Sequence, residues 1–383
     1  MKICAIICEY NPFHNGHEYL IHTAKERTGA DAVLCIMSGN FVQRGQAAVL
    51  EKHIRAKHAI LCGADAVIEL PTVFATSNAE IFACGAISIL SKIPEVSYLC
   101  FGAETADKQA FLDAAQALLD EPESVSAEIK RLMKTGISYA AALSQARADY
   151  ASSTLACKPN NILGLEYTKA LLLAGAKIDI IPIQRMGAEY HDNDINAEYS
   201  SATAIRNAAT SGRIFDAEKQ TPKCVFDDLL YATEIDLSTP EKLAILATSS
   251  DVLASTLDCS EGLENAFKNA AFMPTPLEES LVSARYTASR IRRIALQNLL
   301  NIRKDFVFEC LQAPLYIHPL AYKADRKDLL SALSKASIPF LAAGKAKGEL
   351  SGTAKQCLET DELAEKIYAV LAKKEFDNKT ILV

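Results

Sequence analysis

The stretch ICAIICEYNPFHNGH, residues 3 to 17, decides the fold. It opens with an uninterrupted apolar run from Ile3 to Cys8, which predicts a strand buried on both faces of a sheet. The overlapping segment GHEYLIHTAKERTG, residues 16 to 29, repeats apolar positions at helical spacing and stops at a glycine. A buried strand that leads directly into a helix predicts the first unit of an α/β protein with a parallel sheet.

The same alternation continues through the first half of the chain. Further strands are predicted at 31–39, 65–71, 96–102 and 177–185, and further helices at 47–63, 78–92, 160–176 and 199–212. Residues 105–150 interrupt the rhythm with helical patterns, so we expect a helical insertion there. The pattern predicts a Rossmann-like, doubly wound parallel sheet over residues 1–212.

From residue 213 to residue 383 the strand alternation fades and helical patterns prevail. Helices are predicted at 239–256, 259–271, 283–303, 325–335 and 360–374. We therefore expect a mainly α-helical C-terminal domain after the sheet.

Composition limits the classes of function. The chain has 383 residues, of which 50% are hydrophobic, enough for a large core and two or three domains. No apolar stretch reaches the roughly 18 residues of a membrane span, and the N-terminus lacks a signal-peptide pattern, so we expect a cytoplasmic protein without a membrane partner. The net charge of −7 argues against indiscriminate nucleic-acid binding; no DNA and no obligate protein partner are predicted.

The 11 cysteines are scattered along the chain, and no CxxC pair is followed by a second such pair. This spacing is not that of a zinc site, and in the cytoplasm thiols stay reduced. We interpret the cysteines as small apolar residues of the core.

His14 and His17 bracket Gly16 where the first strand gives way to the first helix. In an open α/β sheet, ligands bind at the carboxyl ends of the strands, where a helix N-terminus offers unpaired N–H groups. Gly16 would let a phosphate approach the backbone, and imidazole can donate to a phosphate oxygen whether neutral or protonated. The alternative is a pair of ordinary histidines at a helix start.

A second helix start lies in SSATAIR, residues 200–206. Ser200, Ser201 and Thr203 offer hydroxyl groups, and Arg206 lies one turn further on. Alone, this segment would be interpreted as a helix cap followed by a surface arginine. Together with His14 and His17, it predicts two helix starts that hold one triphosphate.

These two motifs, HxGH and SSxTxIR, resemble the nucleotidyltransferase superfamily. The segments EYNPFHNGH (9–17), SGNFVQRGQAA, FGAE (101–104), KPNNILGLEY (158–167) and YHDND...YSSATAIR more closely resemble the tRNA(Met) cytidine acetate ligase family, as does RYTASRIRR (285–293) in the second half. The resemblance implies an enzyme that joins acetate to ATP as acetyl-adenylate and releases pyrophosphate. It would then acetylate the wobble cytidine of elongator tRNA(Met).

The resemblance also implies an ATP site. This site would contain Gly102, Arg185, one of Asn160 and Asn161, and the segment Ile7, Cys8, Glu9, Tyr10, Asn11, Pro12, Phe13, His14, Asn15, Gly16, His17, Glu18, Tyr19 and Leu20. The residues expected to act on the phosphates are His14, His17, Ser201, Thr203 and Arg206. Acetate is already ionised at neutral pH, so its attack needs positioning and charge neutralisation more than a general base. Mg²⁺ is expected to bridge the phosphates mostly through water, and no metal-ligating residue is predicted.

Two further polar groups follow the second strand. Gln43 and Arg44 could contact acetate or the tRNA, or Arg44 could be a solvated loop charge. On the next helix we expect a solvated face made of Lys52, His53, Arg55 and Lys57.

An RNA partner needs local positive charge. The second half offers Arg285, Tyr286, Arg290, Arg292 and Arg293. On a helix, Ile291, Ile294, Ala295, Leu299 and Ile302 would form the buried stripe, leaving several arginines toward solvent and Tyr286 free to stack on a base. The alternative is an ordinary solvated face.

Two other functions stay open. An adenylyltransferase acting on a small phosphorylated metabolite, such as nicotinate mononucleotide, would use the same two helix starts, but it would have little use for the long helical second half. The second open function is that of a non-catalytic RNA-binding protein that kept an ATP-binding fold.

Overall fold

A seven-stranded sheet forms the centre of the computed structural model, in the order β7-β6-β1-β2-β5-β8-β9. The structure describes residues 1–120, 123–137, 142, 145–146, 155, 158–185, 200–232, 234–260, 262–341, 347–375 and 379–383. The strands are β1 (Ile3–Cys8), β2 (Ala32–Ser38), β5 (Ala66–Leu70), β6 (Val96–Ala103), β7 (Asp179–Gln184), β8 (Pro319–Tyr322) and β9 (Ile381–Leu382). β1 pairs in parallel with β2 and β6, while β8 runs antiparallel to β5.

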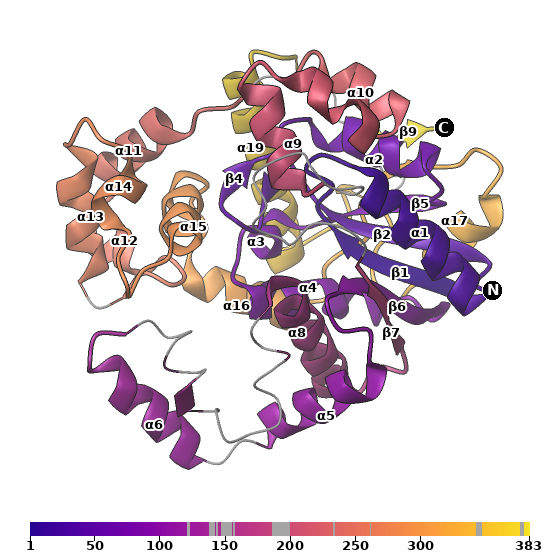
Figure 1. The fold of residues 1–383 in the computed structure, drawn as a ribbon, viewed down its shortest axis with the longest axis horizontal. Coiled ribbons are helices and arrows are strands. Elements are labelled where there is room, and N and C mark those ends of the chain that lie inside the picture. Colours follow the sequence, from indigo (N-terminus) through magenta and orange to yellow (C-terminus); the bar gives the residue numbers. More distant parts are fainter. Residues whose placement is uncertain are drawn as a thin grey trace.

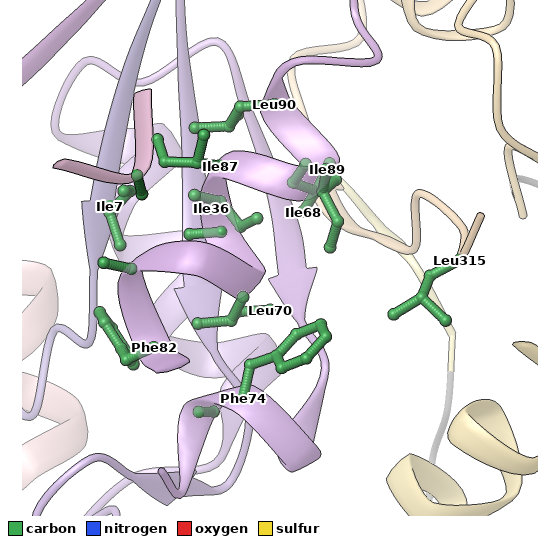
Figure 2. Close-up of a cluster of buried hydrophobic side chains, with 14 of the residues drawn as sticks. Ile7, Ile36, Ile68, Leu70, Phe74, Phe82, Ile87, Ile89, Leu90 and Leu315 are labelled. Atoms are coloured by element: carbon green, nitrogen blue, oxygen red, sulfur yellow. The ribbon is translucent and has the colours of Figure 1, made fainter. Parts of the chain in front are cut away.

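Helices cover both faces of the sheet because β1, like its neighbours, is apolar on both sides. Ile3, Ala5 and Ile7 point into one core, against α3 (Thr72–Ala75), α4 (Ala79–Leu90), α5 (Lys108–Leu119), α8 (Pro159–Ala174) and α19 (Gly352–Ala372). Figure 2 shows part of this core, where Ile7, Ile36 and Ile68 of the strands meet Phe82 of α4 and Phe74 of α3.

Cys4 and Ile6 point into the opposite core. That core is closed by α1 (Asn15–Thr28), α2 (Lys52–Leu61), α9 (Ala202–Thr210), η3 (Ile214–Gln220) and α10 (Lys223–Leu229). The two cores together make the three-layered arrangement expected of a doubly wound α/β fold.

A helical lobe stands to one side of the sheet (Figure 1). It comprises α11 (Ser238–Ala247), α12 (Ser250–Ala254), α13 (Leu263–Ala271), α14 (Leu277–Leu281) and α15 (Ala288–Leu299), and it has its own core around Phe267 and Ile291. After this lobe the chain returns through α16 (Lys304–Gln312), β8 and α17 (Lys327–Leu333) to α19 and β9. Helix α6 (Glu123–Met133) belongs to the expected insertion.

The predicted fold class is confirmed, with differences in detail. Strands β8 and β9 were not predicted, and α19 begins earlier than the expected helix at 360–374. The helix expected at 47–63 begins at Lys52, because a short hairpin of β3 (Phe41–Val42) and β4 (Gln46–Ala47) comes before it. The predicted division at residue 212 stays a prediction.

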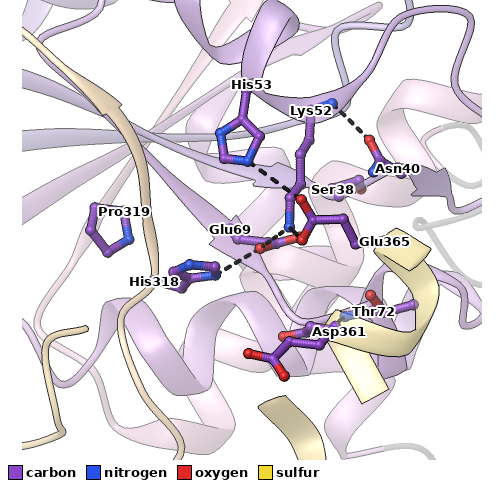
Figure 3. Close-up of polar contacts among 12 residues, drawn as sticks. Ser38, Asn40, Lys52, His53, Glu69, Thr72, His318, Pro319, Asp361 and Glu365 are labelled. Carbon is purple, nitrogen blue, oxygen red and sulfur yellow. Dashed lines mark hydrogen bonds and ion pairs between the residues drawn. The ribbon is translucent and has the colours of Figure 1, made fainter. Parts of the chain in front are cut away.

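The expected solvated face of α2 is wrong for Lys52, His53 and Arg55, which are buried; Lys57 is exposed. Figure 3 shows Lys52 Nζ between the carboxylates of Glu69, 2.9 Å away, and Glu365, 3.0 Å away. Burial alone would lower the pKa of Lys52, but the two carboxylates hold it above its ordinary value. The physical reason for the burial is spacing: Lys52 and Arg55 lie on the same helical face as the core residues Ala56, Ala59 and Ile60.

No helix within the described part of the chain combines the length and the apolar character needed to cross a bilayer. The ten described cysteines are free thiols, most of them buried, as expected of core residues; Cys157 lies outside the described residues.

Candidate functional site

A cavity of about 220 Å³ opens at the carboxyl ends of β1, β6 and β7. Of the predicted residues, it is lined by Ile7, Cys8, Glu9, Tyr10, Asn11, His14, Gly16, His17, Tyr19, Leu20, Gly102, Asn160, Arg185, Ser200, Ser201, Thr203 and Arg206. The two helix starts therefore share one cavity, as the sequence predicted.

The first helix start is built by its two histidines. His14 is the N-cap of α1, and its Nδ1 accepts the N–H of Gly16 at 3.1 Å. The Nδ1 of His17 accepts the N–H of His14 at 3.2 Å, and the two rings stack with centroids 3.7 Å apart. Because both Nδ1 atoms accept, a neutral ring carries its proton on Nε2 in each case, so each histidine offers an Nε2–H donor. Gly16 is needed here, since a Cβ would lie 2.9 Å from Cε1 of His14.

Both histidines are neutral in the free protein at neutral pH. Burial, together with the charges of Arg185 and Arg206, lowers the pKa of His14 to about 3. Burial, His14 and Arg185 lower the pKa of His17 well below its ordinary value. A bound polyanion would act in the opposite direction and raise both pKa values.

The second helix start is tied directly to the first. Ser201 is the N-cap of α9, and its side chain accepts the N–H of Ala204. Arg206 donates to the carbonyl oxygen of Asn11 at 2.6 Å and to Oγ1 of Thr203 at 3.0 Å. This guanidinium joins α9 to the loop after β1 and places a positive charge in the cavity wall.

The two neighbouring asparagines have different surroundings. Asn160 lines the cavity; its Nδ2 donates to Oε1 of Glu104 at 2.7 Å, and its Oδ1 accepts from Arg185 at 3.4 Å. The side chain of Asn161 is turned away into the protein, where its Oδ1 accepts the N–H groups of Glu104 and Thr105 at 3.0 and 3.2 Å. Of the two, Asn160 is thus the one placed to contact a ligand.

Arg185 follows β7 and lies beside Gly102 at the end of β6. A Cβ on Gly102 would come within 3.3 Å of Cγ of Arg185, so a larger residue there would crowd the arginine. Four members of the predicted ATP segment do not line the cavity: Pro12 and Phe13 are buried, and Asn15 and Glu18 lie on the partly exposed first turn of α1. The YHDND motif, residues 190–194, lies outside the described residues.

The sequence left the role of one wall of the cavity open. The β3–β4 hairpin contributes Gln43, Arg44 and Gln46, and the main-chain N–H of Gln43 donates to Oε1 of Glu9 at 2.6 Å. Desolvation raises the pKa of Glu9, against the effects of the Gln43 N–H and of Arg206. Phe82, Phe101, Leu163 and Tyr167 add an apolar surface; Phe101 belongs to the FGAE motif, and Leu163 and Tyr167 belong to KPNNILGLEY, but no apolar role was predicted for them.

Arg55 was missed as a support of the site. Its guanidinium is fully buried and donates to the carbonyl oxygens of Glu9, Ser38 and Gly39, while its Nε donates to that of Leu50 at 2.9 Å. The carbonyls of Glu9, Ser38 and Gly39 lie at the carboxyl ends of β1 and β2, so one arginine holds together the loops at that edge of the sheet. Its position on the apolar stripe of α2 could have indicated the burial.

The predicted RNA-binding residues gather at the start of α15. Arg285 and Arg290 flank the ring of Tyr286, with guanidinium carbons 5.7 and 5.1 Å from its centroid. Arg292 pairs with Glu278 at 2.8 Å. The expectation of a solvent-facing arginine is wrong for Arg293, which is buried and pairs with Asp258 at 3.3 Å.

Comparisons with known proteins agree with this geometry. The HIGH Nucleotidyl Transferase family matches residues 1–381. The tRNA(Met) cytidine acetate ligase of Acetivibrio thermocellus is 35% identical over 97% of this chain and 96% of its own length. The crystal structure of apo Thermotoga maritima TmcAL superposes with a TM-score of 0.92 at 30% identity, covering 100% of both chains. A second structure of that protein, bound with alpha-thio ATP, gives a TM-score of 0.87 over 97% of this chain and 95% of its own. This chain belongs to the HIGH nucleotidyl transferase family and, within it, to the tRNA(Met) cytidine acetate ligases.

Proposed function

We propose that this chain joins acetate to ATP as acetyl-adenylate and transfers the acetyl group to the wobble cytidine of elongator tRNA(Met). One observation carries the proposal: Arg206 bridges Thr203 and the carbonyl of Asn11, so that both helix starts converge on one cavity. The family relationship and the ATP analogue bound to the related Thermotoga maritima protein support ATP as the ligand. A cytoplasmic location is part of the proposal, since tRNA is found there.

In the first step a carboxylate oxygen of acetate forms a bond to the α-phosphorus of ATP, and the bond from that phosphorus to the pyrophosphate oxygen breaks. The leaving pyrophosphate gains negative charge, which donors fixed in advance can stabilise. The N–H groups at the starts of α1 and α9, the Nε2–H groups of His14 and His17, and the guanidinium groups of Arg185 and Arg206 would supply them.

In the second step the exocyclic amine of cytidine attacks the acetyl carbonyl carbon. The bond from that carbon to the AMP oxygen breaks, AMP leaves, and the amine loses one proton. A wobble base must be turned out of the anticodon loop to reach this carbonyl. Arg285, Tyr286, Arg290 and Arg292 would contact the RNA, whereas buried Arg293 would hold the helix that carries them.

The donor set of the cavity fits ATP, because it combines cations with helix starts. No group of three acidic, histidine or cysteine side chains that could hold a metal occurs among the described residues. A Mg²⁺ ion bound with ATP would therefore take phosphate oxygens and water as its ligands.

The test has two parts. Acetate-dependent exchange of labelled pyrophosphate into ATP reports the first step, and mass spectrometry of nucleosides from treated tRNA reports N-acetylcytidine. His17→Ala, or Ser201→Ala with Thr203→Ala, should reduce exchange and leave tRNA affinity largely intact. Dinucleotide formation from nicotinate mononucleotide would instead support the adenylyltransferase, and RNA binding without pyrophosphate release would support a non-catalytic protein.

A further inference from the structure

The β3–β4 hairpin, residues 41–47, stands between the cavity and α15. Its tip is Gly45, which has a φ of +71° and donates its N–H to the carbonyl of Val42 at 2.8 Å. A Cβ on Gly45 would lie 2.5 Å from the backbone nitrogen of Arg293 and 2.6 Å from the carbonyl carbon of Arg292. The residues on either side of this tip, Arg44 and Gln46, line the cavity. One hairpin thus touches both the cavity and the backbone of the helix with the proposed RNA contacts.

Helix α15 is fixed on its other side. Buried Gln297 donates to the carbonyl of Thr76 at 2.9 Å and to Oγ of Ser77 at 3.3 Å, at the junction of α3 and α4. Asp258, which pairs with Arg293, also accepts from Asn78 at 3.3 Å. The helix therefore cannot move away from the hairpin without breaking buried polar contacts.

The base of the hairpin is fixed too. The N–H of Ala48 donates to the carbonyl of Asn40 at 2.9 Å, and the carbonyl of Ala48 accepts the hydroxyl of Tyr368 at 2.9 Å. With its base held and α15 held, the hairpin is the part that must tilt when its tip gains bulk. Such a tilt displaces the cavity wall made by Gln43, Arg44 and Gln46.

We propose that this hairpin positions the acceptor base for acetyl transfer, and that Gly45 is a positioning residue that sets the distance of the cavity wall from α15. The proposal rests on the proposed function. The elements expected to hold ATP are α1, α9 and the carboxyl ends of β6 and β7, whereas the hairpin follows β2. A shift between hairpin and helix should therefore slow transfer to the tRNA far more than adenylation, which it would reach through the hydrogen bond between Gln43 and Glu9.

The substitution Gly45→Ala tests this. To move a Cβ from 2.5 Å to at least 3.4 Å, the tip must shift by about 1 Å. A misplacement of about 1 Å can lower a rate about 10²-fold. We expect single-turnover acetyl transfer from enzyme-bound adenylate to fall by about that factor. Acetate-dependent pyrophosphate exchange and the Kd for tRNA should each stay within about threefold, because their residues are not displaced.

Gly136→Ala is the matched control. Gly136 also has a positive φ, +93°, but a Cβ there would meet nothing within 4 Å, so it reproduces the backbone strain without the contact. Gln46→Ala is the second variant; it removes a side chain from the same wall without a positive φ. We expect it to slow transfer by up to about tenfold, the effect of one lost hydrogen bond, and to affect exchange less than transfer.

The outcomes separate the two levels of the proposal. If wild-type protein shows no acetate-dependent exchange, the proposed function fails. If the wild type performs both steps but Gly45→Ala impairs exchange as much as transfer, or impairs neither, the positioning role is wrong. If Gly45→Ala lowers the melting temperature far more than Gly136→Ala does, the result for Gln46→Ala decides the question. An equal loss of exchange and transfer in Gln46→Ala would also overturn the role of the hairpin.

Discussion

The neighbouring residues Asn160 and Asn161 allow a sharp test of which side chains serve the ligand and which serve the fold. Asn161→Ala removes an oxygen that accepts two main-chain N–H groups, those of Glu104 and Thr105. A donor left without a partner on burial costs about 1–3 kcal/mol. The segment 104–105 is only partly buried, so the low end applies to each donor, and we expect Asn161→Ala to reduce the free energy of unfolding by about 2 kcal/mol.

Asn160→Ala is the matched counterpart. Its amide faces the cavity, where water can replace its contacts with Glu104 and Arg185, so the loss of stability should stay under about 1 kcal/mol. The KM for ATP should rise by up to about tenfold, which corresponds to one neutral hydrogen bond. Urea unfolding midpoints and ATP dependence of pyrophosphate exchange measure the two effects. A reversed pattern, with Asn161→Ala fully stable and weak in ATP binding, would refute the assignment of the two asparagines.

Three further outcomes follow from the contacts. The pKa of His14 is about 3 in the folded protein and about 6.5 in the unfolded chain, so its contribution to stability is complete above the unfolded pKa and is lost as the pH falls toward 3. The wild type should therefore lose unfolding free energy between about pH 7 and pH 5.5. His14→Asn should reduce that loss by about 1 kcal/mol in denaturant titrations. Arg55→Met leaves the carbonyls of Glu9, Ser38 and Gly39 without their donor and should destabilise the protein by about 3–5 kcal/mol, whereas a melting temperature equal to that of the wild type would contradict the support role. Arg285→Ala should weaken tRNA binding, and the slope of the logarithm of the binding constant against the logarithm of the salt concentration should fall by about 0.7–0.9. An unchanged slope would show that Arg285 does not contact the RNA.

Most strands of the sheet that were predictable are largely buried, although β7, which was also predicted, has exposed ends. β1, β2, β5 and β6 are near-continuous apolar runs, interrupted in β5 by Glu69 and in β6 by Ser97, and such runs are typical of parallel strands covered by helices. β8 gave no such run, because it is only the four residues PLAY and opens with a proline. Its place is set by pairing with β5, more than 200 positions earlier in the chain, in a register that places Pro319 opposite Ile68. No local pattern can encode a partner that distant.

The candidate site likewise has a part that the sequence predicts and a part that it does not. The first helix start was predictable because capping residues, a glycine and the end of a strand occur side by side in the sequence, and the second because its serines are typical of a helix cap. The β3–β4 hairpin was not, because each of its strands has two residues and its role depends on Glu9 and α15, which are remote in sequence. Arg55 and Lys52 were misjudged because charge was weighted above position, although both lie on the apolar stripe of α2.

The burial of Lys52 also explains how the last part of the chain is held against the sheet. Lys52 and Glu69 belong to the first half of the chain, whereas Glu365 comes from α19 near its end. Removing α19 and the residues after it would leave this buried cluster one carboxylate short, and β8 would lose β9 as its neighbour, so the sheet and the last part of the chain depend on each other. The lobe of α11 to α15 is therefore an excursion that leaves the sheet after α10 and returns at α16, which packs on α3, α4 and α19. A lobe attached at both of its ends has a fixed distance to the cavity, and that fixed distance is what allows the contact of Gly45 with α15 to set the position of the cavity wall.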